Sequence, residues 1–262
     1  MDAPLPKLAD RYRIVREIAP GPAARRILVR DAERQSAHVV HLAPPESNTI
    51  IAEYIEIFRP LRIPHLAPIE DAVIDDGVVA FVTPYFGHTS GLITLEGLAA
   101  ARGGRLEPEE TESAADHILG LLDELHGRRL YNGPFDGTQV LVDRQGRVQV
   151  EQFGLARALS KGVRDARVAL EGDIRLELRS IIEKLFRCLT GLDSKTMGVS
   201  PSQVRSSLDP MLDDWFAEGL RENGSFESAA AARAALPEKV RTGGVAPPTV
   251  LDSISGLLRR KP

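Results

Sequence analysis

Apolar and polar residues alternate at 11–18, as they do in a strand with one buried face, and further short apolar runs separated by turns follow along the first third of the chain. This pattern predicts strands at 11–18, 27–31 and 37–43, a helix at 48–61 capped by Asn48 or Thr49, and two more strands around Asp76-Gly77. An Asp-Gly pair is typical of the tight turn of a hairpin. The first part of the chain is therefore predicted to form a five-stranded antiparallel sheet with one helix.

Beyond Pro84 the apolar residues recur every three or four positions, which predicts helices. A long helix is expected at 107–130, with a core-facing stripe of Ile118, Leu121, Leu122 and Leu125. The other expected helices are at 92–104, 174–191, 209–221 and 225–236, and a hairpin is expected at 140–150. Strands followed by helices indicate an α+β fold with two lobes.

This pattern divides the chain into residues 10–84, residues 85–240 and a tail of residues 241–262. The tail begins with the linker "RTGGVAPPTV" and ends in "LDSISGLLRRKP". On a helix, four apolar residues of the tail would share one face; they are Leu251, Ile254, Leu257 and Leu258. A lone helix of that length is marginal in water. Two interpretations stay open, a disordered end and a short helix that docks on this domain or on a partner.

The composition narrows the range of partners. The net charge of −4 gives no reason to expect nucleic acid or an anionic membrane as a partner. No apolar run reaches the ~18 residues that span a bilayer, and the first ten residues lack the pattern of a signal peptide. The single cysteine, Cys188, excludes an intrachain disulfide and is interpreted as a small core residue. These features predict a cytoplasmic protein without a membrane span.

Five segments follow one another with characteristic gaps: "DRYRIVREI", "ILVRD", "VLVDRQGRVQVEQFGLARAL", "LRSIIEKLFRCLTG" and "SFESAAAARAAL". Together, from about Asp10 to Leu236, they resemble the serine/threonine protein kinase domains of bacteria. The third segment resembles the stretch that runs from the catalytic loop to the magnesium-binding Asp-Phe-Gly motif of that family. The resemblance implies a two-lobed protein kinase-like fold, with a five-stranded antiparallel N-lobe that carries one helix and a mainly helical C-lobe.

The resemblance also implies a nucleotide site, and several of its positions carry unusual residues. The family's loop G-x-G-x-x-G covers phosphates with backbone N–H groups, but here it reads Ala19, Gly21 and Ala24 with two prolines between. His41 stands in the place of the strand lysine, and Tyr54 in the place of its glutamate partner. A mostly neutral imidazole is a poor substitute for a fixed cation. We interpret the loop as an ordinary hairpin turn and His41 as a core or groove histidine.

The family's catalytic loop, H-R-D-x-x-x-x-N, aligns with Asn132 to Gln139. This alignment places Pro134 at the catalytic aspartate, Gln139 at the magnesium-binding asparagine and Gln152 at the magnesium-binding aspartate. Magnesium prefers hard oxygen ligands, normally with carboxylate charge, which two glutamines do not offer. Glu151 is not expected to substitute for Gln152, because neighbours on an extended strand point to opposite faces.

Further replacements suggest that side chains fill the former nucleotide pocket. Arg26 and Val39 stand where the family has the two apolar residues that enclose the adenine. By the same resemblance, Gly21, Thr83 and Tyr85 complete the former pocket.

The segment that follows the Phe-Gly pair, which binds the substrate in this family, is shorter here. The segment between Gly154 and the helix at 174–191 is about half the length that the family's activation segment needs. "ALE" at 169–171 resembles a remnant of the Ala-Pro-Glu anchor, and Glu177 stands in the place of the aspartate of the buried helix.

With these replacements the resemblance predicts a bacterial pseudokinase. Such a protein is not an enzyme, has no cofactor or metal site, and binds neither ATP nor magnesium. It serves as a protein-binding, scaffolding or regulatory module for another protein in signalling. One alternative is an atypical kinase-fold, ATP-dependent transferase with relocated catalytic residues, for which Asp136, Asp143 and Glu151 are the local carboxylates. Another is a structural domain that orders a partner or its own C-terminal helix.

Overall fold

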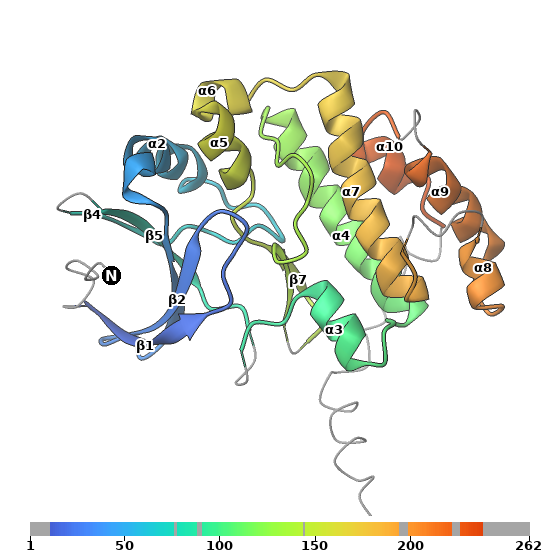
Figure 1. The fold of residues 1–262 in the computed structure, drawn as a ribbon, viewed down its shortest axis with the longest axis horizontal. Coiled ribbons are helices and arrows are strands. Elements are labelled where there is room, and N and C mark those ends of the chain that lie inside the picture. Colours follow the sequence, from blue (N-terminus) through green and yellow to red (C-terminus); the bar gives the residue numbers. More distant parts are fainter. Residues whose placement is uncertain are drawn as a thin grey trace, which may run out of the picture.

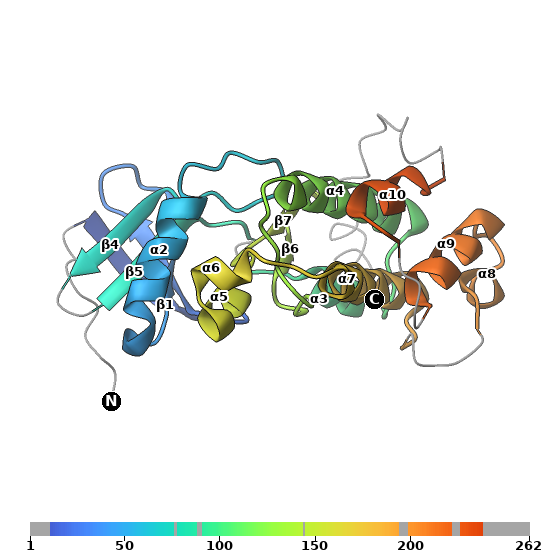
Figure 2. The ribbon, with the colours of Figure 1, turned by 90° about the horizontal axis from the view of Figure 1, so that it is seen from above.

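The computed structural model of the chain describes residues 11–75, 78–87, 91–143, 145–193, 199–221 and 226–237. They form two lobes, one built around a sheet and one built of helices (Figure 1, Figure 2). The α+β fold predicted from the sequence is confirmed. The predicted tail, residues 241–262, lies outside the described residues.

The first lobe is a five-stranded antiparallel sheet, as the sequence predicts. Its strands are β1 Tyr12–Ile18, β2 Arg25–Asp31, β3 Ala37–Leu42, β4 Asp71–Asp75 and β5 Val78–Pro84, in the order β1-β2-β3-β5-β4. One face of the sheet buries a small apolar cluster of Tyr12, Ile27, Val29, Val40, Ala80 and Val82. Side chains alternate between the faces, so Arg26, His41 and Phe81, which lie opposite one another on β2, β3 and β5, share the other face.

Helix α2 (Asn48–Phe58) lies against the sheet and follows a 3-10 turn at Pro45–Ser47 (Figure 2). It buries Ile51, Tyr54, Ile55 and Phe58. The residue that caps it is Ser47, so the predicted cap at Asn48 or Thr49 is placed too late. The Asn48 side chain has another role, because it accepts a hydrogen bond from the backbone N–H of Val79 at 3.0 Å and ties the start of the helix to β5.

The second lobe is mainly helical, with one short hairpin. Its helices are α3 Leu95–Ala101, α4 Pro108–Gly127, α5 Leu155–Lys161, α6 Val163–Ala166, α7 Glu171–Thr190, α8 Pro201–Val204, α9 Pro210–Leu220 and α10 Ala229–Ala234. The hairpin is β6 Val140–Val142 and β7 Val148–Val150. Long helices α4 and α7 lie side by side in the centre (Figure 1). The short helices α5, α6 and α8 were not predicted, whereas the buried stripe of α4 and the buried Cys188 were.

The two lobes are held together beside the hairpin. The backbone N–H of Val150 donates to the carbonyl of His65 at 2.7 Å, and the N–H of Ala67 donates to the carbonyl of Val150 at 2.9 Å. These bonds place the end of β7 against the sheet lobe, so the residues that follow it enter the junction between the lobes. In the part of the chain that the structure describes, no helix is both long and apolar enough to cross a membrane.

Candidate functional site at the junction of the lobes

Gln152 follows β7 and lies at the centre of the junction. Its side-chain oxygen accepts hydrogen bonds from the backbone N–H groups of Ala23, at 3.2 Å, and Ala24, at 3.1 Å. Its nitrogen donates to the carbonyl of Ala24 at 3.2 Å and to Nδ1 of His41 at 2.9 Å. The side-chain amide is buried and fully hydrogen-bonded. It therefore fixes the turn between β1 and β2 onto the second lobe.

The turn at residues 19–24 packs directly on this amide. A Cβ atom added to Gly21 would lie 2.2 Å from the Gln152 nitrogen, which is far inside van der Waals contact. The N–H of Gly21 also donates to the carbonyl of Ala24 at 3.0 Å and closes the turn. The turn is thus more than the ordinary hairpin connection predicted from the sequence, because its remaining glycine allows the backbone to approach Gln152.

His41 continues the chain of hydrogen bonds. Since its Nδ1 accepts from Gln152, its Nε2 is the protonated nitrogen and donates to the hydroxyl of Thr83 at 2.9 Å. The ring stacks on Phe81 with a centroid separation of 4.5 Å. Burial, reinforced by the nearby Arg26 charge, holds the pKa of His41 well below its ordinary value. His41 is therefore a neutral core histidine.

Beside this neutral chain lies a buried ion pair. Nε of Arg26 is 3.0 Å from a carboxylate oxygen of Glu151, and the side chains are 1% and 0% exposed. The other guanidinium nitrogens donate to the carbonyls of Pro20, at 3.2 Å, and Thr138, at 2.9 Å. Burial raises the pKa of Glu151, and the charge of Arg26 opposes that rise. Arg26 thus joins the turn, the segment 132–139 and Glu151.

The orientation of Glu151 corrects a prediction. Neighbouring residues 151 and 152 were expected on opposite faces of an extended strand, but Gln152 has a φ of 51°. At that angle the backbone leaves the extended conformation, so both side chains reach the sheet lobe, Glu151 at Arg26 and Gln152 at His41. Arg26 is likewise buried beneath the turn rather than spread over a pocket.

Gln139 takes part in a second group of buried amides. Its oxygen accepts from the Asn132 side chain, at 3.1 Å, and from the N–H of Asp136, at 3.0 Å. Its nitrogen donates to the oxygen of Asn132 at 2.9 Å, and that oxygen also accepts from the N–H of Gly154 at 2.8 Å. These bonds hold the segment 132–139 against the Phe-Gly segment without any charged group.

The carboxylate of Glu177 on α7 binds the start of the segment 132–139. One of its carboxylate oxygens accepts the backbone N–H groups of Asn132, at 3.0 Å, and Gly133, at 2.9 Å. The other is 3.1 Å from Nε2 of His126 on α4. Because the carboxylate is 1% exposed, these donors satisfy it in place of water.

The other residues named from the sequence differ in burial. Pro134 is exposed, Val39 and Thr83 are buried opposite each other on β3 and β5, and Tyr85 is half-buried just after β5. The N–H of Tyr85 donates to the carbonyl of Ala37 at 3.1 Å.

Two other carboxylates named from the sequence are engaged in their own turns. Asp136 accepts from the N–H of Thr138 at 2.7 Å and from its hydroxyl. Partial burial would raise the pKa of Asp136, but these bonds outweigh it and lower the pKa. Asp143 accepts two backbone N–H groups of its hairpin turn and the guanidinium of Arg147. Within the described ranges, no three His, Cys, Asp or Glu side chains converge in a way that could hold a metal ion.

The whole arrangement was compared with known proteins. The serine/threonine-protein kinase PrkC of Bacillus subtilis (strain 168) is 26% identical over 164 residues, which are 59% of this chain and 24% of PrkC. A solved kinase domain of Mycobacterium tuberculosis PknI matches with a TM-score of 0.64 and 19% identity, over 88% of this chain and 96% of that one. Rad53 1–466 in complex with AMP-PNP matches with a TM-score of 0.67 and 15% identity, over 86% and 65%. No protein-family model matches the chain.

The chain has the fold of a protein kinase. The predicted resemblance to bacterial kinases is confirmed at the level of the fold and of the relatives. The sheet lobe is the N-lobe of this kinase fold and the helical lobe is its C-lobe.

These comparisons correct two predictions made from the sequence. The relatives are named as kinases or kinase domains and point to a kinase enzyme, which contradicts the prediction that the chain is not an enzyme. A neighbour with this fold is described in complex with AMP-PNP, which contradicts the prediction that ATP does not bind. Both predictions rested on the residue at each motif position, and a motif position does not reveal which neighbouring side chain turns into the site.

The segment between Gly154 and α7 is organised by Arg157. Its guanidinium is buried and donates to the carbonyls of Ala166, at 3.0 Å, and Val168, at 2.7 Å, and to Asp173 at 3.0 Å. Helices α5 and α6 make up most of this segment, and both contact α2 of the sheet lobe (Figure 2). Glu171, the last residue of the predicted anchor remnant, starts α7 and is 72% exposed.

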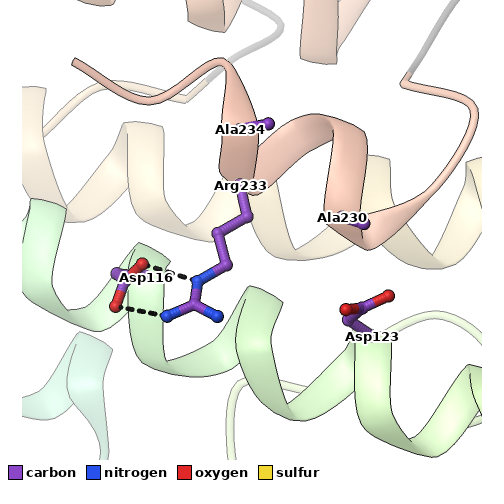
Figure 3. Close-up of a pocket in the computed structure, with 5 residues that line it drawn as sticks. All are labelled: Asp116, Asp123, Ala230, Arg233 and Ala234. Atoms are coloured by element: carbon purple, nitrogen blue, oxygen red, sulfur yellow. Dashed lines mark hydrogen bonds and ion pairs between the residues drawn. The ribbon is translucent and has the colours of Figure 1, made fainter. Parts of the chain in front are cut away.

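A separate cavity of about 350 Å³ lies in the C-lobe between α4 and α10 (Figure 3). Arg233 of α10 reaches Asp116 of α4 with two bonds of 2.7 and 3.0 Å, while Asp123 stands apart from that pair. Sequence analysis missed this cavity because its residues come from helices more than a hundred positions apart. Its ion pair anchors α10 on α4.

Proposed function

We propose that the chain is a nucleotide-binding signalling domain of the serine/threonine kinase type, with its ATP site at the junction of the lobes. The observation that supports this most is the buried pair of Arg26 and Glu151 beneath the turn at 19–24. Buried charges are costly to maintain and often mark functional sites. The names of the relatives and the nucleotide complex of a neighbour agree with this proposal.

The assignment of individual positions is part of the same proposal. His41, Pro134, Gln139 and Gln152 are taken as the positions of the family's lysine, catalytic aspartate, and two metal ligands. The support for the loop assignment is Glu177, which binds the two N–H groups just before Pro134, where a buried acidic residue was expected. Gly21, Arg26, Val39, Thr83 and Tyr85 are taken as positions around the nucleotide.

Nucleotide binding requires the junction to open, because Gln152 occupies the space under the turn. A ligand that binds a minor, open state has an apparent affinity lowered by the fraction of that state. We therefore expect weak binding in the wild-type protein, and tighter binding in variants that weaken the contact of the turn with Gln152. Magnesium, when it enters such a site with a nucleotide, neutralises phosphate charge.

A second candidate function is a regulatory or scaffolding module that acts by binding another protein. The hydrogen-bonded chain from the turn through Gln152 and His41 to Thr83 supports it, because this chain gives the N-lobe a defined closed state. The cytoplasmic location expected from the sequence also stays a prediction.

The test is nucleotide binding and phosphoryl transfer by the purified protein. We expect ATP with magnesium to raise the melting temperature, since ligand at 100 times its Kd adds about 2.7 kcal/mol. Gln152→Asp should strengthen the magnesium-dependent shift because it supplies a carboxylate, whereas Gln152→Asn, of the same size but neutral, should not. Absence of any shift in both the wild type and Gln152→Asp would contradict a nucleotide site. Transfer of labelled phosphate above a no-protein blank would favour the kinase over the regulatory module.

Gly21→Ala is expected to lift the turn from Gln152. The added methyl group cannot occupy a position 2.2 Å from the side-chain nitrogen. The turn should be the part that moves, because Ala19 and Pro20 are exposed whereas Gln152 is buried and makes four hydrogen bonds. The amides of Ala23 and Ala24, which bind Gln152, should then exchange with deuterium at least tenfold faster. Gly172→Ala is the control, because no atom lies within 4 Å of its added methyl. Equal exchange in Gly21→Ala and the wild type would show that the turn is not held by Gln152.

A further inference from the structure

Two charged side chains of the junction lie next to the two family positions that are neutral, one on the neighbouring strand and one at the preceding residue. His41 and Gln152, at the positions of the family's lysine and metal-binding aspartate, are joined by a hydrogen bond of 2.9 Å. Arg26 lies directly opposite His41 in the register of β2 and β3. Glu151 directly precedes Gln152 and is 3.0 Å from Arg26. A cation and a carboxylate are therefore present, side by side with the neutral pair.

Both charged side chains point into the junction for identifiable reasons. Residues opposite each other on antiparallel strands project from the same face of the sheet, so Arg26 shares the face of His41. Glu151 follows the last residue of β7, and the turn of the backbone at Gln152, with φ 51°, lets 151 and 152 approach the sheet together. The strand register and the backbone angle at Gln152 thus determine where both charged side chains lie.

The carboxylate of Glu151 has unused capacity for a ligand. It is 0% exposed, and neither of its oxygens has a hydrogen-bond partner with acceptable geometry in the part of the chain that the structure describes. Nε of Arg26 is close enough for an ion pair but is not aimed for a hydrogen bond. Buried carboxylates are normally satisfied by donors, so these two oxygens are exceptional.

We propose that Arg26 is the phosphate-binding cation and Glu151 the metal-binding carboxylate of a site for a magnesium–nucleoside triphosphate. This inference rests on the proposed function and names the residues that serve it. When the nucleotide binds, Arg26 would leave Glu151 and bind phosphate oxygens. Glu151 would then bind the metal ion in place of Arg26. Both charges therefore keep a partner in the closed and in the nucleotide-bound state.

The chemistry of the two groups suits these ligands. Magnesium is commonly held by one or two carboxylates together with phosphates and water, so one glutamate at this place is sufficient. A guanidinium can bind phosphate through two parallel hydrogen bonds. The rivals are less suitable, because Gln139 already accepts two hydrogen bonds and Asp143 is held by its hairpin turn. Asp136 is the nearest competitor, since its carboxylate is exposed.

The experiment measures AMP-PNP affinity of the full chain in magnesium and in EDTA by calorimetry. In the wild type magnesium should tighten binding at least tenfold. Glu151→Gln, of the same size, should reduce that ratio to about one, and Glu151→Asp should retain part of it because the carboxylate remains. Arg26→Lys should bind in both media, whereas Arg26→Gln should bind more weakly in both. Asp136→Asn should keep the wild-type ratio. Thermal unfolding without ligand verifies that each variant is folded.

Two results would overturn the inference while leaving the proposed function intact. One is a wild-type magnesium ratio in Glu151→Gln, whether or not Asp136→Asn loses it, and the other is wild-type AMP-PNP affinity in Arg26→Gln. A wild-type protein that binds AMP-PNP in neither medium would overturn the proposed function itself.

Discussion

Replacing Arg26 with methionine is expected to lower the free energy of unfolding by about 3–5 kcal/mol, the usual cost of removing one partner of a buried ion pair. The substitution leaves the Glu151 carboxylate in a place with 0% exposure and no hydrogen-bond donor of good geometry. It also removes the donors to the carbonyls of Pro20 and Thr138. Urea unfolding, followed by tryptophan fluorescence of Trp215, measures the loss.

The double variant Arg26→Met with Glu151→Gln separates charge burial from packing. Since glutamine at position 151 carries no charge that could be left buried without a partner, the double variant should be more stable than Arg26→Met alone. If the double variant were as unstable as the single one, the loss would come from packing, and the ion pair would not be responsible.

The stability of Arg26→Met should depend on pH in a defined direction. Burial raises the folded-state pKa of Glu151, and Arg26 opposes the rise; without Arg26 the pKa rises further. A folded carboxyl with a raised pKa keeps its proton after the unfolded chain has lost it, at about pH 4.3. Stability should therefore fall as the pH rises from about 4.3 to the raised pKa, and Arg26→Met should lose more over that interval than the wild type. An equal slope for both proteins would contradict this account of Glu151.

The long helices could be predicted from the sequence because their apolar residues follow one period over many positions, as the stripe of α4 does. The strands could be predicted because short apolar runs lie between turn residues, although the buried positions of β1 and β5 do not alternate. Helices α5 and α6 were not predicted, since seven and four residues are too short for a period to emerge. Their arrangement also depends on Arg157, whose bonds to Ala166, Val168 and Asp173 form only in the folded chain.

The site shows a different limit of sequence analysis. The positions of Arg26, His41 and Gln152 could be predicted from the resemblance, and the structure places all three at one junction. The direction of Glu151 could not be predicted, because it depends on one backbone angle at Gln152, a residue type that seldom adopts positive φ. Reading each motif position by itself therefore identified the neutral pair and missed the charged pair next to it.

Replacing Glu177 with leucine is the other substitution with a large expected effect. It leaves the buried N–H groups of Asn132 and Gly133 without an acceptor and removes the partner of His126. A buried donor that loses its partner costs about 1–3 kcal/mol, so two donors should lower the free energy of unfolding by about 2–6 kcal/mol. Because these groups begin the segment 132–139, the loss should reach the amides of Gln139 and Gly154 as well.

Two comparisons make this prediction specific to the carboxylate. Glu177→Gln keeps an oxygen that can accept both N–H groups, so it should cost much less than leucine. Glu183 lies on the same helix in a partly exposed pair with Arg179, and Glu183→Leu should change stability by no more than about 1 kcal/mol. Urea unfolding gives the energies, and hydrogen exchange at Asn132 and Gly133 locates them. If Glu177→Leu unfolded like Glu183→Leu, with both amides still protected, the segment would be held by the amide pair of Asn132 and Gln139, and Glu177 would not be its support.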